Sequence, residues 1–297
     1  MKYFHGTTDF NMEGASAITL GKFDGVHRGH QKLMHHIKSL ETEGVQSVVF
    51  ALNAKTEELL LTKDERKDVV EELGISCLIE CPFVPEISGM KPEAFVKEIL
   101  VERLHAKYIT VGTDFHFGYQ RQGDAETLKG LQEACGFRVD VIEKERLGDR
   151  EISSTYIREA LSEGKMELAG ELLGRPFYVK GVVQHGRRIG RTLGMPTVNL
   201  VPSREKLLPP NGVYASKTEI DGRLFPGITN IGYKPTVGER FRGVETYLFD
   251  IDQDLYGKEI TTFLYGFERP EQKFSSMEAL RAQMHRDISF GKEYFRG

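Results

Sequence analysis

"AITLGKFDGVHRGHQ", residues 17–31, is the stretch that decides the fold. Its first five residues, 17–21, are short and mostly apolar, as in a buried strand. Beyond the stretch, Leu33, Ile37 and Leu40 recur on one face of a helix. A strand that leads directly into a helix is the start of a βαβ unit. The glycine-rich turn between the two elements is therefore placed at the end of a strand.

The rest of the first half repeats this alternation of strand and helix. We expect further strands at 47–52, 76–81, 107–112 and 137–143, and helices at 62–74, 91–104 and 125–135. Thr62 and Glu65 fit a capping box, and Gly74 fits the end of that helix. Alternating elements predict a parallel sheet with helices on both faces. Ligands of such sheets bind beyond the carboxyl ends of the strands, which is where the turn lies.

The pattern changes near 172–176, where Pro176 follows two short helices. We expect strands at 178–183, 212–220, 224–232, 244–251 and 259–267, and a final helix at 275–295. Many short strands separated by turns predict a small barrel. The sequence thus predicts an α/β domain over 1–172 with a parallel sheet, and a β-barrel domain over 175–297.

The composition limits the kinds of partner and the cellular compartment that we expect. The chain has 297 residues and a formal net charge of −4, which disfavours nucleic acid as the main partner. It has no apolar run of about 18 residues, so we expect no membrane span. The first residues lack a signal segment, so a cytoplasmic location is expected. Three irregularly spaced cysteines indicate reduced, buried thiols, and nothing indicates an obligate protein partner.

The turn itself has the residues of a phosphate site. The unpaired N–H groups of a helix start attract phosphate, and Gly25 and Gly29 allow a close approach of the backbone. His27 and His30 can donate hydrogen bonds to phosphate oxygens as charge develops. Histidines that are only solvated or act as helix caps are the alternative interpretation.

Two later segments offer polar groups of the same kind. "ISSTYIR", 152–158, opens a helix with hydroxyl groups, and Ser154, Thr155 and Arg158 together could bind a polyphosphate. The hydroxyls are also good helix caps, which would explain one of them without a ligand. Asp114 follows a strand and so lies at the ligand edge of the sheet, although a loop aspartate is often a turn former.

The segments "GKFDGVHRGH", "VGTDFHFGYQRQGD" and "ISSTYIR" resemble the adenylyltransferase half of bacterial bifunctional riboflavin kinase/FMN adenylyltransferases, the prokaryotic FAD synthetases. The resemblance implies a Rossmann-like nucleotidyltransferase domain that transfers AMP from ATP to FMN and releases pyrophosphate. It implies that His27 and His30 stabilise the α-phosphate transition state, and that Asp114 contacts substrate. The ATP contacts that it implies are Phe23, Asp24, Gly25, Gly29, Ser154, Thr155 and Arg158.

One segment departs from that family. Its members usually have a proline-rich stretch of the "EPHP" type after the second strand, where this chain has "ALNAKTEELLLT", 51–62. Lys22 stands where many members have Asn. A riboflavin kinase with a weak or altered adenylyltransferase half is therefore the alternative to a fully bifunctional enzyme.

The second half contains its own nucleotide motif, "HGRRIGRTLGMPTVNL", 185–200. Gly186, Gly190 and Arg191 belong to a glycine-rich basic loop, which can bind phosphates or be a surface hairpin. Thr197 and Asn199 are two residues apart and share one face of a strand, where their oxygens could ligate Mg²⁺. In "VETYLFDID", Glu245 alternates with apolar residues, which favours an inward orientation, although a lone strand Glu usually faces solvent. If it faces the pocket, it can accept a proton.

This half resembles the riboflavin kinase module of the same family through "GRTLGMPTVNL", "PPNGVYA", "NIGYKPTVG" and "VETYLFDIDQDLYGKEI". The resemblance implies a small Greek-key barrel with a C-terminal helix that phosphorylates riboflavin to FMN. It implies that the ATP site includes Gly186, Gly190 and Arg191, that Thr197 and Asn199 bind Mg²⁺-ATP, and that Glu245 is the base. The expected ligands are riboflavin, FMN, FAD, ATP and Mg²⁺.

The sequence also leaves three rival functions. A monofunctional nucleotidylyltransferase would act on a different phosphate acceptor and use the barrel only for binding. The altered stretch after residue 52 favours it slightly, but the intact "PTVN" and Glu245 argue against it. An RNA-binding regulator is disfavoured by the acidic charge. A class I tRNA synthetase also has an H-x-G-H turn, but this chain is short and lacks a "KMSKS"-like loop.

Overall fold

The computed structural model describes residues 1–53, 58–185, 194–235, 240–251 and 253–296. The chain forms two compact units, Met1–Ser153 and Ser154–Gly297, and each is treated by itself. The sequence pattern changes near 172–176, but the contacts divide the chain earlier. The reason is that helix α7, Met166–Leu173, packs against β-strands of the second unit.

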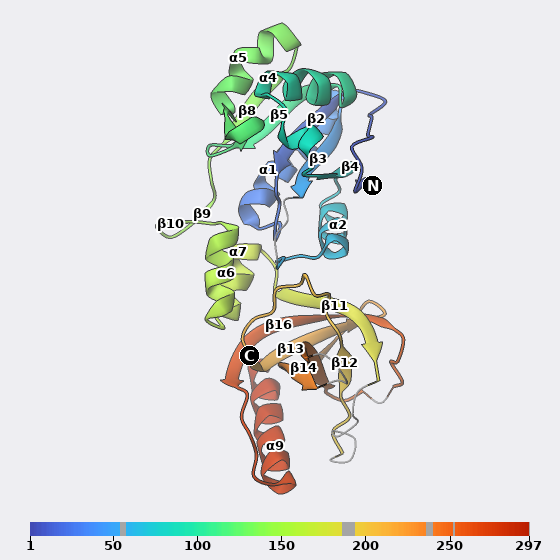
Figure 1. Ribbon diagram of the computed structural model, residues 1–297. Helices are drawn as coiled ribbons and strands as arrows, with labels where there is room; N and C mark the ends of the chain where they lie inside the picture. Colours follow the sequence, from blue (N-terminus) through green and yellow to red (C-terminus); the bar gives the residue numbers. More distant parts are fainter. Residues whose placement is uncertain (54–57, 186–193, 236–239, 252, 297) are drawn as a thin grey trace. The chain divides into compact units, whose positions relative to one another are not determined.

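The first unit is built on a six-stranded parallel sheet in the order β1-β4-β3-β2-β5-β8 (Figure 1). Its strands are β1 (Lys2–His5), β2 (Ser16–Gly21), β3 (Gln46–Asn53), β4 (Cys77–Pro82), β5 (Ala106–Gly112) and β8 (Arg138–Ile142). The chain builds outward from β2 to β4, then returns to the other side of β2 with β5. This reversal makes the carboxyl ends of β2 and β5 the expected ligand site.

Helices join these strands. They are α1 (Arg28–Ser39), α2 (Lys63–Glu72), α3 (Pro85–Ser88), α4 (Pro92–Ala94), the π-helix η2 (Phe95–Arg103) and α5 (Ala125–Cys135). Short elements complete the unit: η1 (Leu40–Glu43), β6 (His116–Phe117), η3 (Tyr119–Arg121), β7 (Gly123–Asp124), β9 (Arg146–Leu147) and β10 (Arg150–Glu151). The predicted capping box of Thr62 and Glu65 is confirmed at the start of α2.

Both faces of the sheet are buried. Alternate residues of β2, Ile18 and Leu20, pack in one apolar cluster with η2 and α5. Ala17 and Thr19, which alternate with them along the strand, are also fully buried, and α1 packs against β2, β3 and β5. The predicted parallel sheet with helices on both faces is therefore confirmed. Cys77 and Cys81 are buried free thiols, as expected, and Cys135 is half-buried.

The second unit contains a closed antiparallel barrel in the order β11-β12-β15-β14-β13-β16. Its elements are α6 (Ser154–Ser162), α7, β11 (Phe177–Gln184), β12 (Val198–Leu200), β13 (Gly212–Ile220), β14 (Arg223–Pro235), β15 (Arg240–Leu248), β16 (Glu259–Pro270) and α9 (Met277–Tyr294). Strands β13, β14 and β15 form a meander, and β12 and β16 flank it on opposite sides. This order is a Greek key, which confirms the predicted barrel.

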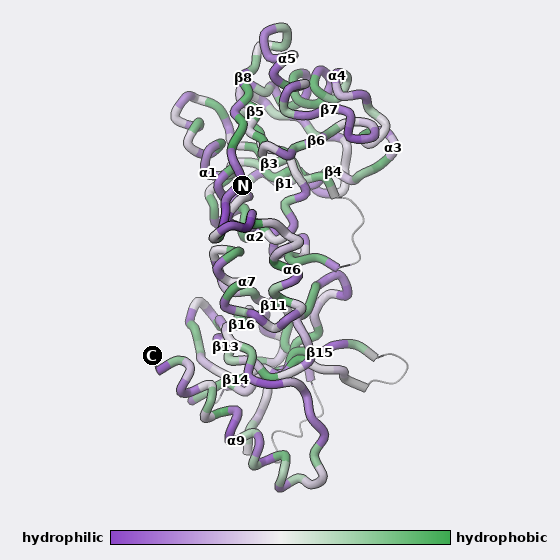
Figure 2. Tube along the Cα trace, turned by 90° about the vertical axis from the view of Figure 1, so that its left-hand side faces the viewer, coloured by the Kyte–Doolittle hydropathy of each residue, from purple (hydrophilic) through white to green (hydrophobic). Residues whose placement is uncertain are grey.

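Helix α9 covers part of the outside of the barrel. In Figure 2 its hydrophilic and hydrophobic residues alternate, and its Ile288 and Phe290 pack against buried Val213 and Ile228. Asp287 of α9 forms an ion pair with Arg269 of β16. Among the described helices, none has the length and apolarity needed to cross a membrane.

Glu268, at the end of β16, makes the stability of this unit depend on pH. Its Oε2 atom is buried and has no hydrogen-bond partner among the described residues. Burial, and then the charge of Asp287, raise the pKa of Glu268 from 4.5 to about 7. A carboxyl group whose pKa is higher in the folded than in the unfolded protein stabilises the fold fully below pH 4.5, the unfolded pKa. This stability is lost as the pH rises from 4.5 to about 7, the folded pKa.

Glu268→Gln is therefore expected to stabilise the protein more at pH 8 than at pH 5. Because Glu268 is partly exposed, we expect a difference of about 1 kcal/mol. Urea unfolding of the full chain at both pH values measures it, with Glu259→Gln, at the exposed start of the same strand, as the control. An equal effect of Glu268→Gln at both pH values would contradict the expectation.

Candidate functional site

The turn after β2 holds a strained backbone. Phe23 and Val26 have φ angles of 49° and 40°, and Gly25 between them has a φ of 86°. The Val26 N–H donates to the Phe23 carbonyl oxygen at 3.3 Å and closes the turn. A β-branched residue is a genuine outlier at positive φ, and such strain is found mainly at functional sites. The strain supports the choice of this turn as a site.

His27 caps helix α1. Its Nδ1 accepts a hydrogen bond from the backbone N–H of His30 at 3.3 Å. A neutral imidazole that accepts at Nδ1 has its proton on Nε2, so His27 presents an N–H donor at its other nitrogen. Gly29 is needed beside it, because a Cβ there would lie 3.3 Å from the His27 ring. The capping interpretation is thus correct, and it leaves the second ring nitrogen as a donor.

His30 stacks on His27, with ring centroids 3.6 Å apart and an angle of 19° between the planes. The Phe23 ring meets His30 edge-on at 5.1 Å. Burial, and then the neighbouring His27, hold the pKa of His30 well below its ordinary value. Its Nδ1 is buried with no hydrogen-bond partner among the described residues, so Nε2 is the nitrogen through which His30 can contact a ligand. His30 is therefore a neutral hydrogen-bonding group at neutral pH.

Charged residues that follow β8 lie at the same edge of the sheet as the turn. Asp114, which follows β5, forms an ion pair with Lys144 at 2.9 Å. The hydrogen bonds that Lys144 donates to Glu151 and Asp114 raise the pKa of Lys144. The next residue, Glu145, binds Arg28 at 2.8 Å. The segment after β8 thus connects Asp114 to the start of α1.

Sequence reasoning missed Lys144 and Glu145. The available signal was their position, because they follow the strand β8 as Asp114 follows β5. The same rule about carboxyl ends of parallel strands applies to both segments.

Ser154, Thr155 and Arg158 lie in the first two turns of α6, in the second unit. Ser154 and Arg158 are four residues apart and so share one face of the helix. Thr155 is exposed and the other two are half-buried. The structure confirms that the three begin a helix, which belongs to the second unit.

The barrel brings the kinase residues together by strand register. Asn199 of β12 lies directly opposite Glu245 of β15, and Glu245 lies directly opposite Asn230 of β14. Residues that are directly opposite in a sheet have neighbouring side chains on one face. Asn199, Glu245 and Asn230 therefore form a polar row across three strands.

This row lies on the outer face of the barrel. Val244 and Thr246, on either side of Glu245, are both buried, and the Thr246 hydroxyl contacts that of Thr229 at 2.8 Å inside the barrel. Because side chains alternate along a strand, Glu245 points outward, and it is half-buried. The inward orientation expected from the apolar residues of this strand is not found, because Val244 and Thr246 are the residues that face the interior.

Thr197 precedes β12, and its carbonyl oxygen accepts a hydrogen bond from Asn199 Nδ2 at 3.4 Å. The amide oxygen of Asn199 then points away from that contact as an acceptor. Within the described ranges, no group of three or more His, Cys, Asp or Glu could hold a metal ion. Gly186, Gly190 and Arg191 lie outside the described residues. Asn230 was not singled out from the sequence, because strand register alone reveals its place beside Glu245.

Comparisons with known proteins match both units. An FAD synthetase family model matches residues 10–156, and a riboflavin kinase family model matches residues 173–295. A bifunctional riboflavin kinase/FMN adenylyltransferase of Buchnera aphidicola is 38% identical over 94% of this chain and 93% of its own. Those of Bacillus subtilis and Escherichia coli K12 are each 34% identical, over 99% and 98% of this chain and 98% and 96% of theirs.

A solved structure described as a macrolide-efflux protein from Streptococcus pneumoniae has the same fold. Its TM-score is 0.85 at 29% identity, and the match covers 94% of both chains. That name belongs to the Streptococcus protein, and the shared fold is what bears on this chain.

A parallel α/β unit with a stacked histidine pair at its ligand edge and an antiparallel barrel with a polar Asn–Glu row are the two domains of an ATP-dependent transferase. The chain belongs to the bifunctional riboflavin kinase/FMN adenylyltransferase family. Its N-terminal domain is an FAD synthetase and its C-terminal domain a riboflavin kinase.

Proposed function

We propose that AMP transfer takes place at the turn between β2 and α1. The Nε2–H of His27 and Nε2 of His30 would contact the α-phosphate of ATP, where negative charge grows as FMN attacks. A preorganised pair of donors stabilises that charge without moving during the reaction. The backbone of Phe23, Asp24 and Gly25 would lie along the nucleotide.

The other phosphates have their own partners in this proposal. Ser154, Thr155 and Arg158 would bind the β- and γ-phosphates, since hydroxyls and a guanidinium at a helix start suit an anion. Asp114 would contact substrate. Its ion pair with Lys144 supports a fixed position for the carboxylate.

In the kinase domain, Glu245 would accept the proton of the riboflavin 5′-hydroxyl as that oxygen attacks the γ-phosphate of ATP. Thr197 and Asn199 offer oxygen ligands, which is the donor type that Mg²⁺ requires. Because these two oxygens cannot fill its coordination, phosphate oxygens and water would supply the rest. Bound there, Mg²⁺ would neutralise phosphate charge. Gly186, Gly190 and Arg191 would lie near ATP.

The stacked, buried His27–His30 pair is the observation on which the adenylyltransferase assignment depends most. Product analysis tests the whole proposal. Riboflavin with ATP and Mg²⁺ is expected to give FMN and then FAD, and supplied FMN with ATP and Mg²⁺ is expected to give FAD. EDTA is expected to abolish both steps. Formation of FMN without FAD at high enzyme concentration would favour the alternative, an altered acceptor site near 51–62.

A further inference from the structure

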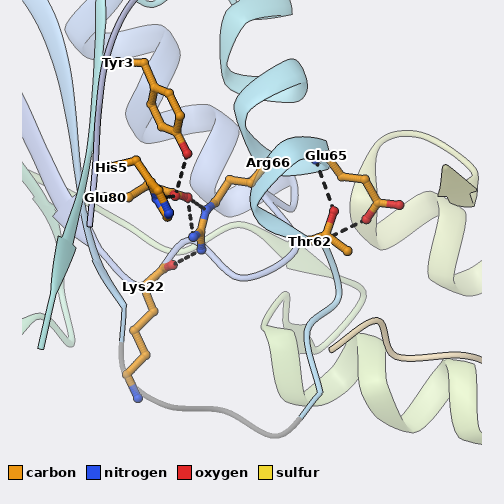
Figure 3. A network of polar contacts seen from close by, with 7 residues as sticks. All are labelled: Tyr3, His5, Lys22, Thr62, Glu65, Arg66 and Glu80. Carbon is orange, nitrogen blue, oxygen red and sulfur yellow. Dashed lines mark hydrogen bonds and ion pairs between the residues drawn. The ribbon is translucent and has the colours of Figure 1, made fainter. Parts of the chain in front are cut away.

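A buried carboxylate lies near the phosphate turn and collects three donors (Figure 3). Glu80, on β4, is fully buried and accepts hydrogen bonds from Tyr3 Oη at 2.8 Å and Arg66 Nε at 2.6 Å. His5 Nδ1 lies 2.9 Å from the same carboxylate. A buried charge of this kind needs such partners, because desolvation alone would be costly. The group ties strand β1 and helix α2 to β4.

Arg66 also contacts the turn after β2. Its Nη1 donates to the backbone carbonyl oxygen of Lys22 at 3.3 Å, directly after β2 (Figure 3). The capping box of Thr62 and Glu65 fixes the first turn of α2, where Arg66 lies. A planar guanidinium can serve the carboxylate of Glu80 and a carbonyl at the same time.

The strand register leaves room for this contact. Gly21, Ala51 and Glu80 lie side by side on β2, β3 and β4, and only Glu80 has a long side chain. A Cβ on Gly21 would lie 3.1 Å from the Phe23 ring, so that ring packs over Gly21. The Phe23 ring also meets His30 edge-on. The carbonyl that Arg66 holds thus belongs to the residue that precedes Phe23.

Residues 60–66 bind the same turn at a second point. Asp24 Oδ1 accepts a hydrogen bond from the Leu60 N–H at 2.9 Å. Residues on both sides of Phe23, whose φ is 49°, are therefore bound to the stretch 60–66. A strained conformation persists only where its surroundings hold it.

We propose that Arg66 is a positioning residue for AMP transfer: it joins the buried Glu80 to the Lys22 carbonyl and so holds the turn in which His27 and His30 meet ATP. The inference rests on the proposed function of that turn. Arg66 acts through the backbone of Lys22 and the ring of Phe23 and does not contact substrate.

Arg66→Lys tests this role, because lysine keeps the charge beside Glu80 but cannot bridge two acceptors as a guanidinium does. We expect the kcat of FAD formation to fall about ten- to a hundredfold, because small misplacements of reacting groups have effects of that size. The KM values are expected to change less than threefold. Riboflavin phosphorylation by the same chain, at the barrel, is expected to be unchanged.

Arg103→Lys is the matched control. Arg103 also donates to a backbone carbonyl of the first unit, that of Thr8 at 2.8 Å, but it lies away from the turn. Histidine ring NMR supplies a readout besides activity. The His27 and His30 Cε1–H signals are expected to move in Arg66→Lys and to stay in place in Arg103→Lys.

Unchanged kcat and unchanged His signals in a folded Arg66→Lys would overturn the inference, and so would equal losses in both arginine variants. His30→Ala distinguishes the positioning role of Arg66 from the proposed function of the turn. If it loses AMP transfer while Arg66→Lys does not, only the positioning role fails; if it keeps AMP transfer, the proposed function of the turn fails. Should Arg66→Lys not fold, Tyr3→Phe removes one donor from Glu80 and is expected to lower the same kcat two- to threefold. No change there would equally overturn the inference.

Discussion

His30→Ala is expected to lower the rate of FAD formation from FMN and ATP about 100- to 1000-fold, the usual effect of losing one transition-state donor. His30 is held neutral by burial and by the His27 ring stacked on it. A neutral imidazole still carries one N–H, so His30 can donate a hydrogen bond at neutral pH. Riboflavin phosphorylation is expected to continue at the wild-type rate, because the barrel does not depend on this ring.

His27→Asn separates capping from chemistry at the neighbouring ring. Asparagine is a good helix cap, so α1 is expected to remain folded, but the Nε2–H donor is lost. We expect AMP transfer to fall as it does in His30→Ala. His35→Ala, an exposed histidine on the same helix, is the control. The assignment is wrong if either turn variant keeps AMP transfer within about twofold of His35→Ala.

Much of the first unit could be predicted from the sequence, because its strands and helices alternate with clear periodicity. Among the six strands of its main sheet, the exception is β1, Lys2–His5, which pairs in parallel with β4 at the edge. Four half-exposed residues carry no periodic signal, so local pattern could not reveal this strand. Its residues Tyr3 and His5 matter only through Glu80, a contact between positions 75 or more residues apart.

The candidate site residues likewise divide into those that the local sequence reveals and those that depend on contacts between distant strands. His27 and His30 could be found because the turn, the helix start and the glycines are adjacent in the chain. The place of Asn230 beside Glu245 follows from the register of two strands, which the sequence does not specify. Glu245 itself could be named, but not its face, because Thr246 is a polar residue that turns inward to bond Thr229.

Glu245→Gln is expected to lower FMN formation from riboflavin about 100- to 10,000-fold, the range for loss of a general base. Glutamine keeps the size and the place opposite Asn199 but cannot accept the proton of the 5′-hydroxyl. AMP transfer to supplied FMN is expected to be unchanged, since it uses the histidine turn. HPLC of the flavin products measures both steps in one sample.

Glu219→Gln, an exposed glutamate on β13 of the same barrel, controls for the loss of a charge. The kinase rate of that variant is expected to match the wild type. Because Glu245 lies on the outer face, its replacement removes no interior contact, and the thermal unfolding of the barrel is expected to shift little. If Glu245→Gln phosphorylates riboflavin normally, Glu245 is not the base; if it loses both activities together, the two steps do not have separate sites.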